Sequence, residues 1–139
     1  MNGTLKNYGP STKCATPEGN GTANGTVITL WTCTGSYVQE WQWNSARQLV
    51  HKASGKCMTP RGDAYATNGA VLTLWTCSSS ADSQKFSMGN RAPWQWQTWS
   101  QYGGKCLTNY GGNFSNGTWV TLWACATGEG QPREQNWTI

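Results

Sequence analysis

Apolar and polar residues alternate regularly in a seven-residue stretch that occurs three times along the chain. The three copies span residues 27–33, 71–77 and 119–125. Because successive side chains of a strand point to opposite faces, the pattern predicts a strand in each copy. One face then carries an aliphatic pair, such as Leu72 and Leu74 in the second copy, and should lie in the core. The other face carries a threonine and a tryptophan, which are Thr29 and Trp31, Thr73 and Trp75, and Thr121 and Trp123.

The repeated tryptophan allows two interpretations. It is either ordinary core, or a lid over a nearby disulfide, since tryptophan is buried on average; or it is an exposed aromatic platform. Large apolar side chains are seldom exposed in repeated positions without a partner to bind. We therefore favour the platform.

Further elements recur in the same order around each predicted strand. A Lys-Cys pair precedes it, an Asn-Gly pair that favours a tight turn stands before it, and a Gln-x-Trp or Gln-x-Phe motif follows. The match predicts one domain over residues 1–139, built from three internal repeats at approximately 1–44, 45–92 and 93–139, each of four short strands. The least regular stretch, 89–99, contains Trp94 and Trp96 alternating with glutamine, which predicts a strand with one exposed face. No segment sustains the apolar period of a helix.

One apolar face per unit cannot make a core, so the three units are expected to pack around a threefold axis. The predicted core joins the strand leucines to the aromatic residues of the Gln-x-Trp/Phe motifs. These residues are Leu30, Leu74, Leu122, Trp41, Phe86 and Trp137. A closed all-β arrangement of this kind also removes exposed strand edges.

Six cysteines indicate an oxidising compartment, and hence a secreted protein. They fall into three pairs separated by 19, 20 and 19 residues: Cys14 and Cys33, Cys57 and Cys77, Cys106 and Cys125. Six cysteines permit 15 pairings, but a threefold repeat favours one disulfide within each repeat. Zinc is disfavoured because its ligands usually come as closely spaced Cys or His pairs.

Composition excludes several classes of function. Only 12% of residues are charged, and the basic residues behind the net charge of +4 are scattered, which argues against nucleic acid or an anionic membrane as the main partner. No apolar run reaches membrane-spanning length. His51 is the sole histidine and the acidic residues fall at non-equivalent positions, so we expect no catalytic site, cofactor or metal.

The first residues lack the features of a signal peptide, so we expect either a removed signal or a domain cut from a longer chain.

Taken together, Lys-Cys-aliphatic, Asn-Gly, Leu-Trp-x-Cys and Gln-x-Trp/Phe in three ordered copies resemble the ricin B-type β-trefoil lectins. The most similar in style are the family 13 carbohydrate-binding modules attached to secreted bacterial glycoside hydrolases. The resemblance implies a β-trefoil of twelve short strands, with a six-stranded barrel, three capping hairpins and one disulfide in each repeat. It also implies that Gln-x-Trp is structural, and that Trp31, Trp75 and Trp123 stack on sugar rings.

Threonine replaces the usual polar groups around each tryptophan. Members that bind sugar usually carry an aspartate two residues after the first cysteine, where this chain has Thr16, Thr59 and Thr108. They often carry an amide two residues before the stacking aromatic, where this chain has Thr29, Thr73 and Thr121. We expect these six threonines, with Asp63, to supply the hydrogen bonds. Threonine binds more weakly than a carboxylate, whose hydrogen bonds are about twice as strong as neutral ones.

The predicted function is non-catalytic binding of a polysaccharide or glycan, galactose- or xylose-type by resemblance, with an attached glycoside hydrolase as a candidate covalent partner. The alternatives are a protein-interaction trefoil and a structural trefoil that has lost sugar binding. The second repeat is expected to be the strongest site, because Arg61, Asp63 and Tyr65 lie in its loop. The first repeat has Glu18 and Asn20; the third has Tyr110, Asn113 and Phe114 but no carboxylate in its loop.

Overall fold

The computed structural model describes residues 2–92, 95–126 and 133–139, which form an all-β fold of short antiparallel strands. The strands are β1 (Asn2–Thr4), β2 (Lys6–Tyr8), β3 (Thr12–Pro17), β4 (Ile28–Thr32), β5 (Glu40–Trp43), β6 (Leu49–His51), β7 (Cys57–Pro60), β8 (Leu72–Trp75), β9 (Phe86–Ala92), β10 (Gln95–Ser100), β11 (Lys105–Asn109), β12 (Val120–Ala124) and β13 (Trp137–Thr138). Three-residue 3-10 turns connect them: η1 (Glu18–Asn20), η2 (Tyr37–Gln39), η3 (Arg61–Asp63), η4 (Asp82–Gln84), η5 (Tyr110–Gly112) and η6 (Arg133–Gln135). As predicted, the described ranges contain no α-helix.

The described residues contain thirteen strands instead of the expected twelve because the extended N-terminal segment is divided at Leu5 into two strands. The residues before Leu5 form β1, which pairs with β5, whereas the residues after it form β2, which pairs with β3 and β13. Leu5 itself is fully buried, and its carbonyl accepts a hydrogen bond from the Ala15 amide at 2.8 Å. One extended segment therefore serves two sheets.

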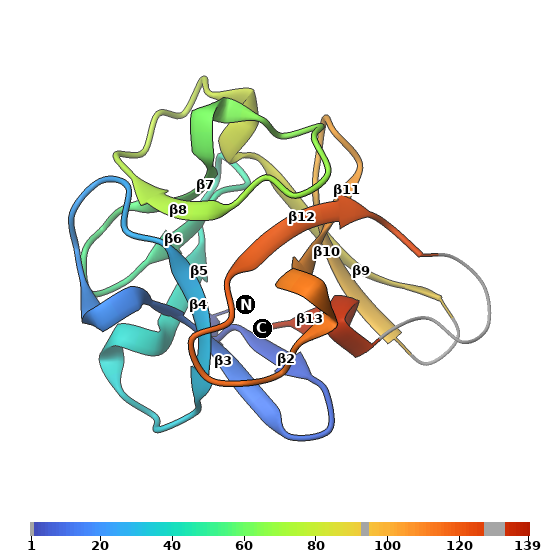
Figure 1. The fold of residues 1–139 in the computed structure, drawn as a ribbon. Coiled ribbons are helices and arrows are strands. Elements are labelled where there is room, and N and C mark those ends of the chain that lie inside the picture. The colour runs from blue at the N-terminus through green and yellow to red at the C-terminus, as the bar shows by residue number, and fades with distance from the viewer. Residues whose placement is uncertain (1, 93–94, 127–132) are drawn as a thin grey trace.

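The strands form three antiparallel sheets, with orders β1-β5-β6-β7-β8, β13-β2-β3-β4 and β12-β11-β10-β9. Figure 1 shows the three predicted central strands, β4, β8 and β12, arranged around the middle of the molecule. The C-terminal strand β13 pairs with β2, so the two ends of the chain meet in one sheet.

The three sheets are joined in a ring by main-chain contacts. Isolated bridges link Val27 to Thr73, Val71 to Thr121 and Trp119 to Thr29, so each predicted repeat contacts the other two in the same way. Further main-chain hydrogen bonds repeat this relation, including Leu74 N–H to Thr26 at 2.9 Å and Leu122 N–H to Ala70 at 2.9 Å. The Asn-Gly turn before each central strand therefore lies against the next central strand around the ring.

The predicted core is confirmed. Leu30, Leu74, Leu122, Trp41, Phe86 and Trp137 are fully buried in a single cluster. The alternation in the central strands explains this arrangement, because every second side chain points toward the common centre. Trp41 also satisfies its indole N–H by donating to the Ala15 carbonyl at 3.1 Å.

The predicted disulfides are also confirmed. Cys14 pairs with Cys33, Cys57 with Cys77 and Cys106 with Cys125, each with a Cα–Cα distance of 5.1 Å. Every disulfide joins a strand (β3, β7 or β11) to the segment that follows the neighbouring strand in the same hairpin. This position fixes the end of each strand that carries the repeated tryptophan.

Within the described ranges, no helix has the length and apolar character needed to cross a bilayer. The same residues include no group of three or more His, Cys, Asp or Glu side chains placed to hold a metal ion.

Candidate functional site

The three repeated tryptophans lie on the surface. Trp31, Trp75 and Trp123 are 47%, 49% and 47% exposed, although the leucine immediately before each is fully buried. The reason is the strand alternation, which turns the indole away from the core. The interpretation of these tryptophans as ordinary core is therefore wrong, and we call them the platform tryptophans.

Each platform tryptophan forms one wall of a pocket. The first pocket (Trp31) has a volume of about 290 Å³, the second (Trp75) about 300 Å³ and the third (Trp123) about 490 Å³. In each, two of the predicted threonines and the 3-10 turn after the first strand of the hairpin line the pocket together with the tryptophan. These turns are η1, η3 and η5. The structure thus brings together the residues that the sequence assigned to one site.

The hydroxyl groups of the six threonines already donate hydrogen bonds to main-chain carbonyls. In the second pocket, Thr59 Oγ1 donates to the Cys57 carbonyl at 2.9 Å, and Thr73 Oγ1 donates to the Thr59 carbonyl at 2.9 Å. Both side chains are at least 94% buried. The other two pockets repeat these bonds at 2.8–2.9 Å, from Thr16 to Cys14, Thr29 to Thr16, Thr108 to Cys106 and Thr121 to Thr108. The threonines form the pocket floors and hold the hairpins together.

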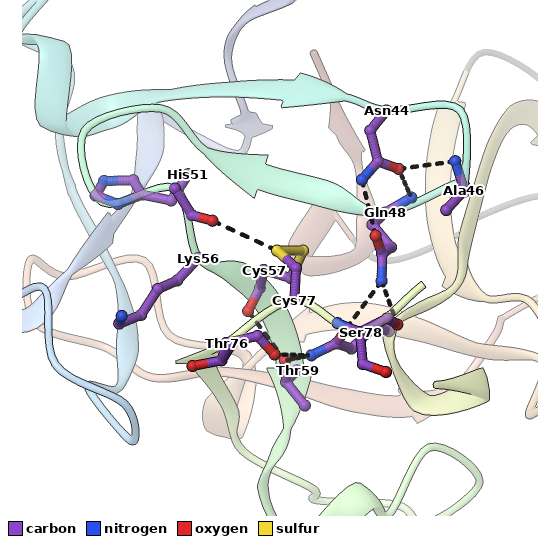
Figure 2. Close-up of a disulfide and its surroundings, with 12 residues drawn as sticks. Asn44, Ala46, Gln48, His51, Lys56, Cys57, Thr59, Thr76, Cys77 and Ser78 are labelled. Atoms are coloured by element: carbon purple, nitrogen blue, oxygen red, sulfur yellow. Dashed lines mark hydrogen bonds between the residues drawn. A yellow bond between two sulfur atoms is a disulfide. The ribbon is translucent and has the colours of Figure 1, made fainter. Parts of the chain in front are cut away.

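The Gln-x-Trp/Phe glutamines complete the floors. Gln84 Nε2 donates to Thr59 Oγ1 at 3.1 Å and to the Thr76 carbonyl at 3.0 Å, while its Oε1 accepts from the Ser78 amide at 2.8 Å. Gln39 and Gln135 make the corresponding bonds. Figure 2 shows Thr59, Thr76 and Ser78 gathered around the Cys57–Cys77 disulfide. The structural role that the resemblance implied for this motif is confirmed.

Polar side chains at the rim differ among the pockets. Arg61 and Asp63 line the second pocket, as the sequence predicted, and Asp63 Oδ1 accepts a hydrogen bond from Ser83 Oγ at 2.8 Å. Glu18 and Asn20 line the first, and Tyr110 lines the third. Three predicted rim residues, Tyr65, Asn113 and Phe114, do not line any of these pockets; the Phe114 ring instead lies over Gly9.

Glu134 was not among the predicted site residues, but it lines the third pocket, which it reaches from the turn η6. The sequence contained a signal for it, because Glu134 stands directly before Gln135, where sugar-binding members of the family that the chain resembles commonly carry an asparagine.

The Asn-Gly turns also contribute to the sites. Gly25 lines the second pocket and Gly117 the first, and a Cβ on Gly69 would lie 3.4 Å from the Trp123 ring. The asparagines fix this contact: Asn24 Nδ2 donates to Thr76 Oγ1 at 3.1 Å, and Asn68 Oδ1 accepts from the Ala124 amide at 2.8 Å. Each site is therefore shared between two predicted repeats, whereas the sequence indicated only a turn.

A fourth depression, of about 430 Å³, lies apart from the platform tryptophans. Its lining includes Trp43, Arg47, Met88 and Trp96. Trp96 is 40% exposed, which agrees with the strand predicted to expose one face; the accompanying Trp94 lies outside the described residues.

His51 lies outside all four depressions. It is fully buried, with Nε2 2.7 Å from the Val38 carbonyl and Nδ1 2.7 Å from Ser54 Oγ. Because a carbonyl only accepts, Nε2 carries the proton and Nδ1 accepts from the serine. Burial lowers the pKa of His51 below its usual 6.5, against an opposing effect of the hydrogen bond to Val38. The histidine is a neutral structural residue.

Comparison with known proteins places these features in a family context. Residues 1–86 match the sequence model of the "Ricin-type beta-trefoil lectin domain". No curated protein sequence matches the chain.

Similar solved structures include both isolated trefoils and parts of larger proteins. The designed threefold-symmetric protein ThreeFoil is 20% identical with a TM-score of 0.85, over 98% of this chain and 95% of that one. The C-terminal half of the earthworm R-type lectin, solved with GalNAc, is 14% identical with a TM-score of 0.71, over 91% of this chain and 88% of that one. An exo-β-1,3-galactanase of Clostridium thermocellum, 1,3Gal43A, is 20% identical with a TM-score of 0.81; all of this chain aligns, but with only 30% of the enzyme. At these identities the likeness shows a shared fold.

Proposed function

Since the chain belongs to the ricin-type β-trefoil lectin domains, we propose that it is a non-catalytic carbohydrate-binding module whose platform tryptophans stack on sugar rings. The observation that carries the proposal is the threefold display of a half-exposed indole beside a pocket with polar groups on its rim. Sugar rings have apolar C–H faces and a periphery of hydroxyls, so an aromatic face beside hydrogen-bonding groups suits both.

The division of roles within each site follows from the hydrogen bonds. The six threonines have no free hydroxyl proton, so we assign them to the floor of the pocket rather than to sugar recognition. Recognition then falls to the indole and to the rim, where Asp63 is the side chain in the second pocket best suited to accept hydrogen bonds from a sugar.

Each site is expected to bind weakly. Aromatic pairing contributes about 0.5–1.5 kcal/mol beyond buried area, and a neutral hydrogen bond contributes about 1 kcal/mol net. Three sites around one axis can reach separate parts of one polymer, and their combined affinity then exceeds that of any single site. A polysaccharide is therefore the preferred ligand, with galactose- or xylose-type sugars as the first candidates.

The alignment with a part of a larger galactanase supports a targeting role beside a catalytic domain, and the three disulfides support an extracellular location. A protein-interaction trefoil is the alternative from another class, because exposed tryptophans also anchor protein interfaces.

The test is affinity electrophoresis of the chain through gels containing galactan or xylan, with the indole fluorescence recorded on titration with oligosaccharides of each type. We expect retardation in at least one polymer and a change in fluorescence. The single variants Trp31→Ala, Trp75→Ala and Trp123→Ala should each weaken both, whereas Trp96→Ala, an exposed tryptophan outside the three pockets, should keep them; circular dichroism checks that each variant is folded. Failure of the wild type to bind any glycan, or a loss in Trp96→Ala equal to the losses in the three pocket variants, would reject the proposal.

A further inference from the structure

The fourth depression, of about 430 Å³, shares no lining residue with the pockets of the platform tryptophans. Its floor follows one face of β9, where Phe86 is fully buried and Met88 is partly buried against the core. Trp43 stands two residues after the aromatic of its Gln-x-Trp motif, as Met88 does in the second repeat, and it also lines the depression and packs against the core. The depression therefore lies where the shared core reaches the surface.

Arg47 and Trp96 line this depression from equivalent positions in two repeats. Each stands directly before a buried glutamine, Gln48 or Gln97, whose side chain donates to the carbonyl of the residue after the second cysteine of its repeat. The indole of Trp96 is 40% exposed, and Arg47 is exposed as well. The two repeats therefore bring an aromatic ring and a cation to one depression.

The backbone of Arg47 lies in the left-handed region, with φ of 62°, within a tightly bonded turn. Asn44 Oδ1 accepts from the amides of Ala46 and Gln48 at 3.0 Å each, as Figure 2 shows. Glycine is favoured in this conformation because it has no Cβ to clash with the main chain. An arginine here is less favourable than a glycine, and backbone outliers of this kind are frequent at binding sites.

The Arg47 guanidinium has no carboxylate partner within the described ranges. Its hydrogen bond to Ser87 Oγ is long, at 3.4 Å, and the only ion pair among those residues lies elsewhere. No acidic residue lines the depression in the part of the chain that the structure describes. Lys85, whose ammonium donates to the Ala46 carbonyl at 2.9 Å, adds a second positive charge beside the turn. The depression therefore suits an anionic group.

We propose that this depression is a fourth binding site, which takes an acidic sugar: Arg47 pairs with the carboxylate of a uronic acid residue, and Trp96 covers the apolar face of its ring. A planar guanidinium matches a carboxylate in a bidentate, charge-assisted pair. The proposal takes the ligand class, a sugar, from the proposed function. Its charge preference is opposite to that of the three tryptophan pockets, because like charges repel and each of those pockets is lined by a carboxylate, from Glu18, Asp63 or Glu134.

The test follows the indole N–H resonances of Trp96 and the platform tryptophans in ¹H–¹⁵N spectra of the intact chain. Glucuronic and galacturonic acids are the probes, glucose and galactose are their neutral counterparts, and acetate is the control for a carboxylate without a sugar ring. We expect the two acids to shift the Trp96 resonance, and the neutral sugars and acetate to leave it in place. Added NaCl should weaken the binding of the acids, because salt screens an exposed ion pair.

Arg47→Gly separates recognition from stability. Glycine suits the left-handed backbone, so this variant should melt at the wild-type temperature or above it. It should nevertheless bind the acids about tenfold more weakly or worse in calorimetric titrations, as expected when a hydrogen bond to a charged group is lost. Arg47→Lys keeps the charge without the planar fork and should fall between the two. Lys56→Gln removes a positive charge outside the four depressions and should bind the acids like the wild type.

The outcomes separate this proposal from the proposed function. An equal shift of Trp96 with acetate, wild-type affinity of Arg47→Gly for the acids, or a response to poly-glutamate in place of the sugars would each overturn the fourth site. If Trp96 never responds while the platform tryptophans respond to neutral sugars, the fourth site fails and the proposed function stands. If Trp96 responds to the acids and the platform tryptophans respond to no glycan, the fourth site stands and the proposed function fails.

Discussion

Replacing Gln84 by alanine should destabilise the protein more than the same replacement of a less buried glutamine. The reason is that the Gln84 amide group forms hydrogen bonds with Thr59, Thr76 and Ser78 in the second hairpin. Gln84 is 2% exposed. Besides its bonds to Thr59, Thr76 and Ser78, its Oε1 accepts from Gln48 Nε2 at 2.8 Å.

The magnitude follows from the partners that the substitution leaves behind. Thr59 keeps its bond to Cys57, and Gln48 keeps a bond to the Ser78 carbonyl at 2.7 Å. The Ser78 amide and the Thr76 carbonyl lose their hydrogen bonds to the Gln84 side chain. An unsatisfied buried group costs about 1–3 kcal/mol, and these two lie close to the surface, where water relieves part of the cost. We expect a loss of about 2–4 kcal/mol in the free energy of unfolding, or about 10 °C in Tm.

Urea unfolding at pH 7 with the disulfides intact measures this loss, since the free energy of unfolding falls linearly with denaturant. The matched control is Gln42→Ala. Gln42 is half-buried on β5, and its side chain makes no hydrogen bond within the described ranges, so its loss should cost under about 1 kcal/mol. A Gln84→Ala variant no less stable than this control would refute the view that the glutamine holds the pocket floor.

Three further predictions concern the other structural features. Trp75→Ala should lower the free energy of unfolding by about 2–3 kcal/mol, since roughly half of the large indole surface is buried. Trp41 is fully buried, so Trp41→Ala should lower it more in the same urea assay. Equal losses would show that Trp75 contributes to stability like a core residue. Removing the disulfide with Cys57→Ala/Cys77→Ala should cost about 3 kcal/mol, as expected for a loop of 20 residues, and a variant as stable as wild type would contradict it. Burial lowers the pKa of His51 below 6.5 in the folded protein, so on acidification the unfolded chain binds this proton before the folded chain does. The contribution of His51 to the free energy of unfolding is therefore fully present above pH 6.5 and decreases as the pH falls below it. His51→Gln should show a smaller decrease between about pH 7 and pH 5, and a pH profile identical to that of the wild type would refute the view that His51 is buried in its neutral form.

The sequence alone determined the features that depend on local period and spacing. Alternation in the central strands placed Leu74 inward and Trp75 outward, because a strand repeats its orientation every two residues. The threefold repeat selected the cysteine pairing, and the resemblance identified Gln84 as structural. Each of these features lies within one repeat, and the comparison of the three copies along the chain was enough to recognise it.

Only the tertiary structure decided which side chains line each pocket and which of their polar groups already have hydrogen-bond partners. The sequence could not show that the hydroxyl protons of Thr59 and Thr73 are taken by main-chain carbonyls, because a threonine beside a tryptophan is equally able to face a ligand. Nor could it place Glu134 over Gly112, which meet when the third repeat folds back on itself, or Asn24 beside Thr76, which meet only when neighbouring repeats close the ring. A strand's local pattern fixes which way a side chain points, whereas the identity of its neighbours depends on how separate hairpins pack around the common axis.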